Sequence, residues 1–297
     1  MRRASVAIAG LLVLIGLLWL GAVPWTTYAA CGGGTPASLP SSVRVGLYEE
    51  FPTPARLDRL RHLDFPVSLA VAAASRADFL RFRDTIRQTY PQVRDFFFWP
   101  LLTPAQGYYP GTWSDAAAVQ RAANDADGLP VLWDLELPRN LAVHSPRDWL
   151  RNREFLDRWL RQRTQPTHVW RSLTAMGLDT ALLRLSALHF DPRDYPRLSL
   201  QLDLYATGAG LPDPLLRRVL RCAVERYAGR FVASFGALND GEGNPDAFVP
   251  PATLRRYLRA ARDTGVAEVW LFGVNGLSDD VVRAVREALP MGTSVPA

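Results

Sequence analysis

From residue 43 onward, short apolar runs alternate with longer amphipathic segments. Apolar runs of about four to eight residues predict buried strands, and apolar positions three or four apart predict helices that cover them. The predicted strands are 43–48, 67–72, 93–99, 129–135, 181–188, 198–205, 231–235 and 268–272. The predicted helices are 55–62, 76–90, one capped by Ser114 or Asp115, 146–163, 213–227, 251–263 and 279–289. This alternation predicts a (β/α)8 TIM-type barrel, with an open doubly wound sheet as the alternative.

The predicted strand 198–205 shows its two faces most clearly. Apolar and polar residues alternate along it, as Leu198, Ser199, Leu200, Gln201, Leu202, Asp203, Leu204 and Tyr205. A period of two places the leucines on one face and the polar residues on the other. In a barrel, the leucines would face the surrounding helices and the polar residues would face the interior.

An uncharged apolar run of 18 residues, 6–23, precedes this pattern and follows Arg2 and Arg3. It is close to the roughly 20 residues that span a bilayer and longer than the usual core of a cleaved signal peptide, about 7–15 residues. Residues 1–30 therefore predict a transmembrane or signal helix. The positive-inside rule then places the rest of the chain, membrane-anchored or secreted, on the extracytoplasmic side.

Residues 28–34 (YAACGGG) also resemble a bacterial lipoprotein cleavage site, in which Cys31 would carry lipid. Residues 31–42 have the Gly, Pro and Ser content of a linker, and we assign 43–290 to one barrel domain and 291–297 to a tail. The second cysteine, Cys222, falls on the helical pattern 213–227 and is expected to be a small buried residue. We expect no disulfide to be needed for folding.

The net charge and the types of basic residue exclude some partners and reactions for this protein. The net charge is +5, but the arginines are scattered along the predicted helices, so we expect no nucleic-acid partner. All 34 basic residues are arginine, which excludes Schiff-base and Walker-loop chemistry because both require lysine. The histidines 62, 144, 168 and 189 show no metal-ligand spacing, and we expect no cofactor.

Candidate chemistry gathers at the carboxyl ends of the predicted strands, where barrels carry their active sites. These positions hold Glu49, Glu50, Trp99, Asp134, Glu136, Gln201, Asp203, Tyr205, Asn239, Glu242 and Asn275. Acids, amides and aromatic rings dominate this set. Such groups are typical of carbohydrate chemistry.

Asp134 and Glu136 are the strongest pair. Two residues apart on a strand, they share a face about 7 Å apart. Mutual repulsion is expected to raise one pKa. We expect Glu136 to titrate above its usual value of about 4.3 and Asp134 to stay ionised. The alternative is that both carboxylates are solvated or paired with arginines such as Arg139.

The sequence Asp134-Leu135-Glu136, at the end of a fourth strand, resembles the D-x-E motif of chitinase-like glycoside hydrolases and barrel-type muramidases. In both families the glutamate of this motif is the general acid. The resemblance implies a barrel fold and a proton-donating role for Glu136. The chain departs from the chitinase pattern, which has further aspartates where Pro130 and Leu132 stand here.

Aromatic residues support a sugar ligand. Trp99, Tyr108, Tyr109 and Trp113 lie in or beside one loop, and sugar rings pack on aromatic planes. Trp133 and Trp270 lie in strands and are expected in the core.

Together these features predict an exported or membrane-tethered glycoside hydrolase that acts on cell-envelope or extracellular polysaccharide. Glu136 would be the acid/base and Asp134 its partner, while Asp203 and Tyr205 would orient or stabilise the substrate. The remaining candidates at the strand ends and in the aromatic loop would bind substrate. The alternative is a catalytically silent barrel that binds glycans or an envelope partner, because a barrel alone decides neither.

Overall fold

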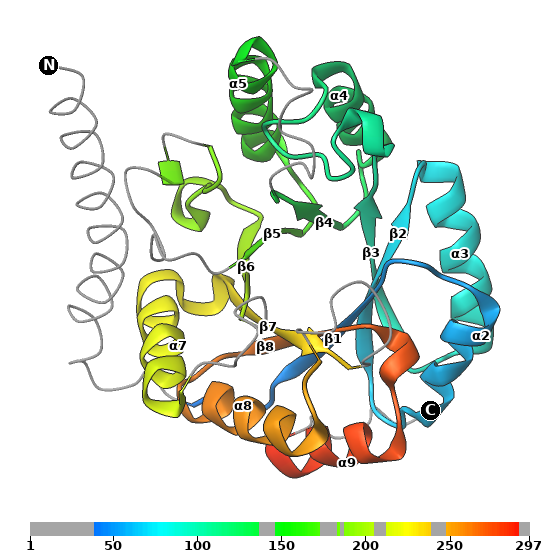
Figure 1. The fold of residues 1–297 in the computed structure, drawn as a ribbon, viewed down its shortest axis with the longest axis vertical. Helices are drawn as coiled ribbons and strands as arrows, with labels where there is room; N and C mark the ends of the chain where they lie inside the picture. Colours follow the sequence, from blue (N-terminus) through cyan, green and yellow to red (C-terminus); the bar gives the residue numbers. More distant parts are fainter. Residues whose placement is uncertain are drawn as a thin grey trace, which may run out of the picture.

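The computed structural model describes residues 39–136, 146–172, 183–184, 187–204, 212–238 and 248–290. Its strands close into an eight-stranded parallel barrel in which each strand pairs with the next and β8 pairs with β1 (Figure 1). The strands are β1 (Arg44–Glu49), β2 (Val67–Ala73), β3 (Val93–Pro100), β4 (Val131–Asp134), β5 (Thr167–Ser172), β6 (Leu198–Asp203), β7 (Phe231–Ala237) and β8 (Glu268–Phe272). The TIM-type barrel is thus confirmed, and the open sheet is wrong.

The described helices surround the ring of strands (Figure 1). They are α2 (Pro54–Leu57), α3 (Arg76–Thr89), α4 (Ala116–Asp125), α5 (Pro146–Gln162), α7 (Asp213–Tyr227), α8 (Pro251–Asp263) and α9 (Asp279–Ala288). Short 3-10 turns are η1 (Asp58–His62), η2 (Pro104–Gln106), η4 (Pro192–Asp194), η5 (Ala228–Arg230) and η7 (Val274–Gly276). The predicted helix 55–62 is divided between α2 and η1. Side-chain caps at Ser75, Asp115 and Ser278 fix the starts of α3, α4 and α9.

The fifth strand lies elsewhere than predicted. β5 is Thr167–Ser172, whereas the described residues of the predicted strand 181–188 include a short helical piece at 183–184 and a turn at Ala187. β5 escaped the apolar pattern because it carries His168 and Arg171, which are both buried. Polar residues can occupy a strand when the barrel interior supplies partners for them.

The molecule has two separate apolar cores. The larger one lies between strands and helices and contains the three β6 leucines and Leu204 after them, so their predicted orientation is confirmed. Trp133 also belongs to it and packs on Trp159 of α5 at 4.5 Å between ring centroids. The second core fills the barrel interior and includes Tyr48, Trp99, Trp170 and Trp270. Both strand tryptophans, Trp133 and Trp270, are fully buried as predicted.

Gly46 of β1 has no room for a side chain. A Cβ there would lie 2.2 Å from two ring atoms of the buried Trp270 indole. Gly46→Ala is therefore expected to destabilise the fold by about 1–3 kcal/mol, the usual cost of overpacking. Gly229→Ala is the matched control, because a Cβ at Gly229 meets nothing within 4 Å. Thermal unfolding measures both; equal melting temperatures for the two variants would contradict the packing described here.

The predicted membrane segment falls outside the described residues, as do Cys31 and the tail. Within the part of the chain that the structure describes, no helix is both long enough and apolar enough to cross a bilayer. Cys222 is buried in the outer core, as predicted for a small apolar residue.

Candidate functional site at the carboxyl end of the barrel

A polar network begins at the base of the barrel interior. Glu268, at the start of β8, accepts hydrogen bonds from Arg44 Nη2 at 2.6 Å and from Trp270 Nε1 at 2.6 Å. His168 Nε2 lies 3.7 Å from Glu268 Oε1. Burial alone would raise the pKa of Glu268, but His168, Arg44 and the Trp270 N–H together hold it below its usual range. Burial lowers the pKa of His168, which favours the neutral imidazole.

The network continues toward the carboxyl ends of the strands. Gln201 Oε1 lies 3.2 Å from His168 Nδ1, and because this oxygen can only accept, Nδ1 carries the hydrogen. Gln201 Nε2 donates to the Tyr48 hydroxyl at 2.9 Å, and that hydroxyl also bonds to Ser234. Burial, and next the charge of Asp203, raise the pKa of Tyr48 well above its usual value. Tyr48 therefore stays a neutral hydroxyl beneath the site.

Asp134 ends β4 at the top of this network and is 1% exposed. Its Oδ1 accepts a hydrogen bond from the Glu136 backbone N–H at 2.9 Å. Its other oxygen, Oδ2, is buried and has no hydrogen-bond partner among the described residues. This bond turns the chain directly after β4, so Glu136 follows the strand instead of extending it.

The acid pair titrates differently from the expectation. Burial, followed by the charges of Glu136, Glu50 and Asp203, raises the pKa of Asp134 well above its usual range. This direction is opposite to the prediction that Asp134 stays ionised while the raised pKa belongs to Glu136. The period-two argument treated both carboxylates as equally solvated. In the structure, Asp134 is enclosed whereas Glu136 is partly exposed, and desolvation is the larger effect.

The aromatic loop between β3 and α4 covers the same end of the barrel. The Tyr108 hydroxyl donates to Glu50 Oε1 at 2.5 Å, and Tyr108 has a φ of 68°, which is uncommon outside glycine. A Cβ on Gly111 would lie 2.8 Å from the Glu136 carbonyl oxygen, so this loop passes directly over the end of β4. Asn152 of α5 anchors it by donating to the carbonyls of Thr112 and Ser114.

Aromatic rings pack together at the same end of the barrel as these acids. Trp99 and Tyr109 are nearly parallel, with 3° between their planes and 6.5 Å between their centroids. Tyr48 contacts the rings of both Trp99 and Phe272. The Trp99 indole N–H is buried and has no hydrogen-bond partner among the described residues. We call this region the barrel mouth; it comprises Glu50, Asp134, Glu136, Asp203, Tyr48, Trp99, Tyr108, Tyr109 and Phe272.

The other predicted site residues are distributed as follows. Gln201 lies in the polar network below the mouth, and Asn275 lies in η7 directly after β8. Glu49 ion-pairs with Arg56 of α2 at 3.1 Å, and Trp113 packs on Trp149 of α5, so neither belongs to the mouth. Tyr205, Asn239, Glu242 and Arg139 lie outside the described residues.

Sequence analysis missed several residues of this interior. They are Tyr48, His168, Trp170, Ser234 and Glu268. Strand parity was the available signal for Tyr48 and Ser234, which alternate with outward residues such as Leu47 and Phe235. In the described ranges, no group of three or more His, Cys, Asp or Glu side chains is arranged to hold a metal ion.

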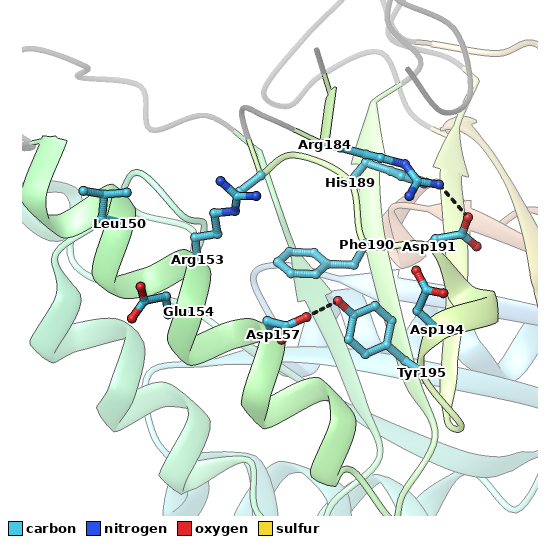
Figure 2. Close-up of a pocket in the computed structure, with 11 residues that line it drawn as sticks. Leu150, Arg153, Glu154, Asp157, Arg184, His189, Phe190, Asp191, Asp194 and Tyr195 are labelled. Atoms are coloured by element: carbon cyan, nitrogen blue, oxygen red, sulfur yellow. Dashed lines mark hydrogen bonds and ion pairs between the residues drawn. The ribbon is translucent and has the colours of Figure 1, made fainter. Parts of the chain in front are cut away.

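A separate hollow of about 510 Å³ lies between α5 and the segment that leads into β6 (Figure 2). In Figure 2, Asp157 and Tyr195 point toward each other and are joined at 2.6 Å, and Arg184 reaches Asp191 at 3.0 Å. Desolvation opposes ionisation of Asp157 and Asp191, yet hydrogen bonds from Arg161 and Arg193 respectively hold both pKa values below the usual range. Asp157, Arg184 and Asp191 at this hollow are thus bonded to neighbouring side chains.

The sequence matches no protein-family model and no curated protein. Among solved structures, it is similar to a D-allulose 3-epimerase from Methylomonas sp., with 13% identity and a TM-score of 0.49 over 85% of this chain and 100% of that chain. A chitinase from Chromobacterium violaceum ATCC 12472 has 13% identity and a TM-score of 0.49 over 83% and 99%. The spore cortex-lytic enzyme SleL of Bacillus megaterium QM B1551 has 9% identity and a TM-score of 0.47 over 83% and 74%. Similarity at this level carries no inference about chemistry.

Proposed function

We propose that this barrel is a glycoside hydrolase whose general acid is Asp134. The observation that carries the proposal is a buried carboxyl group with a raised pKa, one oxygen of which, Oδ2, has no partner among the described residues. A carboxylic acid that keeps its proton near neutral pH can protonate the oxygen of a glycosidic bond. From Oδ2 that proton can be given to a substrate.

The neighbouring acids supply the remaining roles. When the Asp134 proton passes to the glycosidic oxygen, the carbon–oxygen bond breaks and positive charge develops on the sugar ring. We assign stabilisation of that charge to Asp203, which is buried close enough to raise the pKa values of Asp134 and Tyr48. Glu136 is partly exposed, so we assign it to the activation of water, which completes hydrolysis.

The aromatic rings would position the sugar. Trp99, Tyr109 and Phe272 pack together at the same end of the barrel as the acids, and the Trp99 N–H can donate to a sugar oxygen. The second candidate, a catalytically silent glycan-binding barrel, rests on these rings alone. Assays on a panel of neutral, cationic and anionic polysaccharides separate the two. Cleavage that Asp134→Asn abolishes supports the hydrolase, whereas binding without cleavage by the unaltered chain supports the binding protein.

We also propose that the barrel works outside the cytoplasm, on cell-envelope or extracellular polysaccharide, because residues 6–23 are apolar and uncharged. The full chain is expected to sediment with membranes, and a chain that begins at Thr35 is expected to be soluble and folded. Fractionation followed by circular dichroism measures both. Full-length protein in the soluble cytoplasmic fraction would contradict this proposal.

A further inference from the structure

Arginines line the outer face of α5, which carries five arginines and three acids. Arg147, Arg151 and Arg158 are exposed, and none of them forms an ion pair or a hydrogen bond with another described residue. At about 100° per residue, the three fall within one sector of about 40°, on the side of the helix opposite the buried Leu156. We call these three residues the arginine strip.

The acids of α5 offset only part of this charge. Glu154 lies on the same face and offsets one of the three positive charges. Asp157 is bonded to Arg161, and Asp148 is half-buried on the flank of the helix. The segment 137–145, which precedes α5, contains no acid in its sequence. The arginine strip therefore keeps a positive charge that no described side chain pairs with.

Arginines on α8 and α9 behave differently, because most of them pair with acids. The pairs are Arg255 with Glu287, Arg256 with Asp213, Arg262 with Asp263, Arg283 with Asp280 and Arg286 with Asp64. Pairing of this kind leaves those faces close to neutral. The face of α5 is thus the better surface for a partner with negative charge.

The arginine strip borders a groove of about 360 Å³ between α4 and α5. The groove is lined by Arg151, Glu154, Phe155 and Arg158 of α5 and by Ala116, Ala117 and Gln120 of α4. The α4 side therefore adds no charge. An anionic group such as a phosphate can approach both guanidinium groups from this groove.

Apolar side chains lie among these charges. Leu150 is 51% exposed. The ring of Trp149 before it packs on Trp113 at 5.8 Å between centroids, and the Arg153 guanidinium lies over the Trp149 ring. Arginine together with exposed leucine and tryptophan is typical of helices that lie on anionic membranes. A soluble polyanion requires no apolar contact, so this combination favours a lipid surface.

We propose that α5 docks the barrel, through the arginine strip and Leu150, on a membrane surface that contains anionic phospholipids. This inference rests on the proposed membrane tether at residues 6–23. The 20 residues 24–43 can reach at most roughly 70 Å, so the tether alone leaves the orientation of the barrel open. Docking fixes it. Because α5 packs on the side of the barrel (Figure 1), the mouth then opens along the membrane surface.

Fluorescence quenching in vesicles tests this docking. The full chain with Cys31→Ser is labelled at Gln162→Cys, an exposed position at the end of α5, and the buried Cys222 stays unlabelled. It is reconstituted into vesicles of phosphatidylcholine, with or without phosphatidylglycerol, whose headgroups carry a quencher. Quenching is expected only with phosphatidylglycerol and should weaken as salt is raised. A label at Arg259→Cys on α8, on the opposite side of the barrel (Figure 1), should stay unquenched.

Variants of the arginine strip test whether its charge causes docking. Arg151→Gln combined with Arg158→Gln should lower the ratio of docked to undocked chains about 25-fold, at roughly fivefold for each arginine. Arg151→Lys combined with Arg158→Lys keeps the charge and should retain docking. Arg94→Gln combined with Arg259→Gln is the matched control, because both arginines are exposed and form no ion pair with a described residue. It has the same net charge as the first variant and should dock normally.

The inference is overturned by equal quenching at Gln162 in neutral and anionic vesicles, or by equal losses in the glutamine variant and its control. Binding of soluble polyphosphate through the strip, without quenching in anionic vesicles, would also overturn it and would assign the strip to a soluble polyanion.

Failure of docking differs from failure of the tether. A full chain that floats with both kinds of vesicle but shows no quenching overturns docking alone. A chain that floats only with anionic vesicles, through the strip, retains docking and removes the tether. Cleavage assays with soluble glycans test the hydrolase independently of both.

Discussion

Asp134→Asn is expected to lower glycan hydrolysis by about 10²–10⁴-fold, the contribution of a positioned general acid. The asparagine amide keeps an oxygen that can accept the Glu136 N–H but cannot donate a catalytic proton. Because Asp134 is buried and favours its neutral form, the neutral amide should preserve the fold. The measurement is kcat on whichever glycan the unaltered protein cleaves, with unfolding followed in parallel.

Glu136→Gln is the comparison that assigns the proton donor. If Asp134 is the acid and Glu136 activates water, Glu136→Gln should keep the basic limb of the pH–rate profile, which reports loss of the Asp134 proton, and Asp134→Asn should remove that limb. Loss of the basic limb of the pH–rate profile in Glu136→Gln, with near-normal activity in Asp134→Asn, would show that Glu136 is the general acid.

The raised pKa of Asp134 should also make the free energy of unfolding depend on pH. The folded state holds a proton on Asp134 above the ordinary pKa of about 3.9, where the unfolded chain has lost it. The free energy of unfolding therefore falls as pH rises between the unfolded and folded pKa values, by about 1.4 kcal/mol per pH unit at most. Asp134→Asn removes this slope, so the variant should gain stability relative to the unaltered protein as pH rises.

Glu268→Ala is expected to destabilise the barrel by about 3 kcal/mol, because it leaves the buried Trp270 N–H without its acceptor and removes the buried side chain that packs beside His168. Arg44 is largely exposed, so its share of the ion pair contributes little. The expected fall in melting temperature is roughly 6–12 °C for a domain of this size. Glu268→Gln, which keeps an acceptor oxygen, should lose less.

The contribution of Glu268 to the free energy of unfolding changes with pH in the opposite direction from that of Asp134. The pKa of Glu268 is depressed in the folded state, so its stabilisation is present above the unfolded value and is lost as pH falls through the folded value. The difference in stability between Glu268→Ala and the unaltered protein should therefore narrow in acid. A difference that stays constant down to the acid limit of folding would contradict the ion-pair account.

The barrel could be predicted from the sequence because most of its strands show their two faces openly. β6 alternates leucines with polar residues, and caps such as Ser75 and Ser278 mark where α3 and α9 begin. β5 could not be found in this way. His168 is stable in that strand because Gln201 lies beside it on β6 and Glu268 lies across the barrel, and no local pattern contains those contacts.

The protonation of Asp134 and Glu136 could not be predicted from their spacing in the sequence. The spacing predicted Asp134 and Glu136 on one strand face, whereas β4 ends at Asp134; the structure adds the charges of Glu50, after β1, and Asp203, at the end of β6. Which carboxyl holds the proton depends on burial, and burial depends on the loop that passes over Glu136 at Gly111. Tyr48 was overlooked because its role arises from Gln201 on β6 and Ser234 on β7, strands that do not pair with β1 and lie far from it in the sequence.

The most direct test of a protonated acid at the barrel mouth is the pKa of Asp134 in the folded protein. Carboxyl carbon NMR of the folded chain, with Asp134→Asn to assign the signal, gives this value without any substrate. The account predicts a midpoint well above the ordinary aspartate value of about 3.9. A midpoint at or below that value would contradict it, because Asp134 would then be ionised and unable to donate a proton near neutral pH.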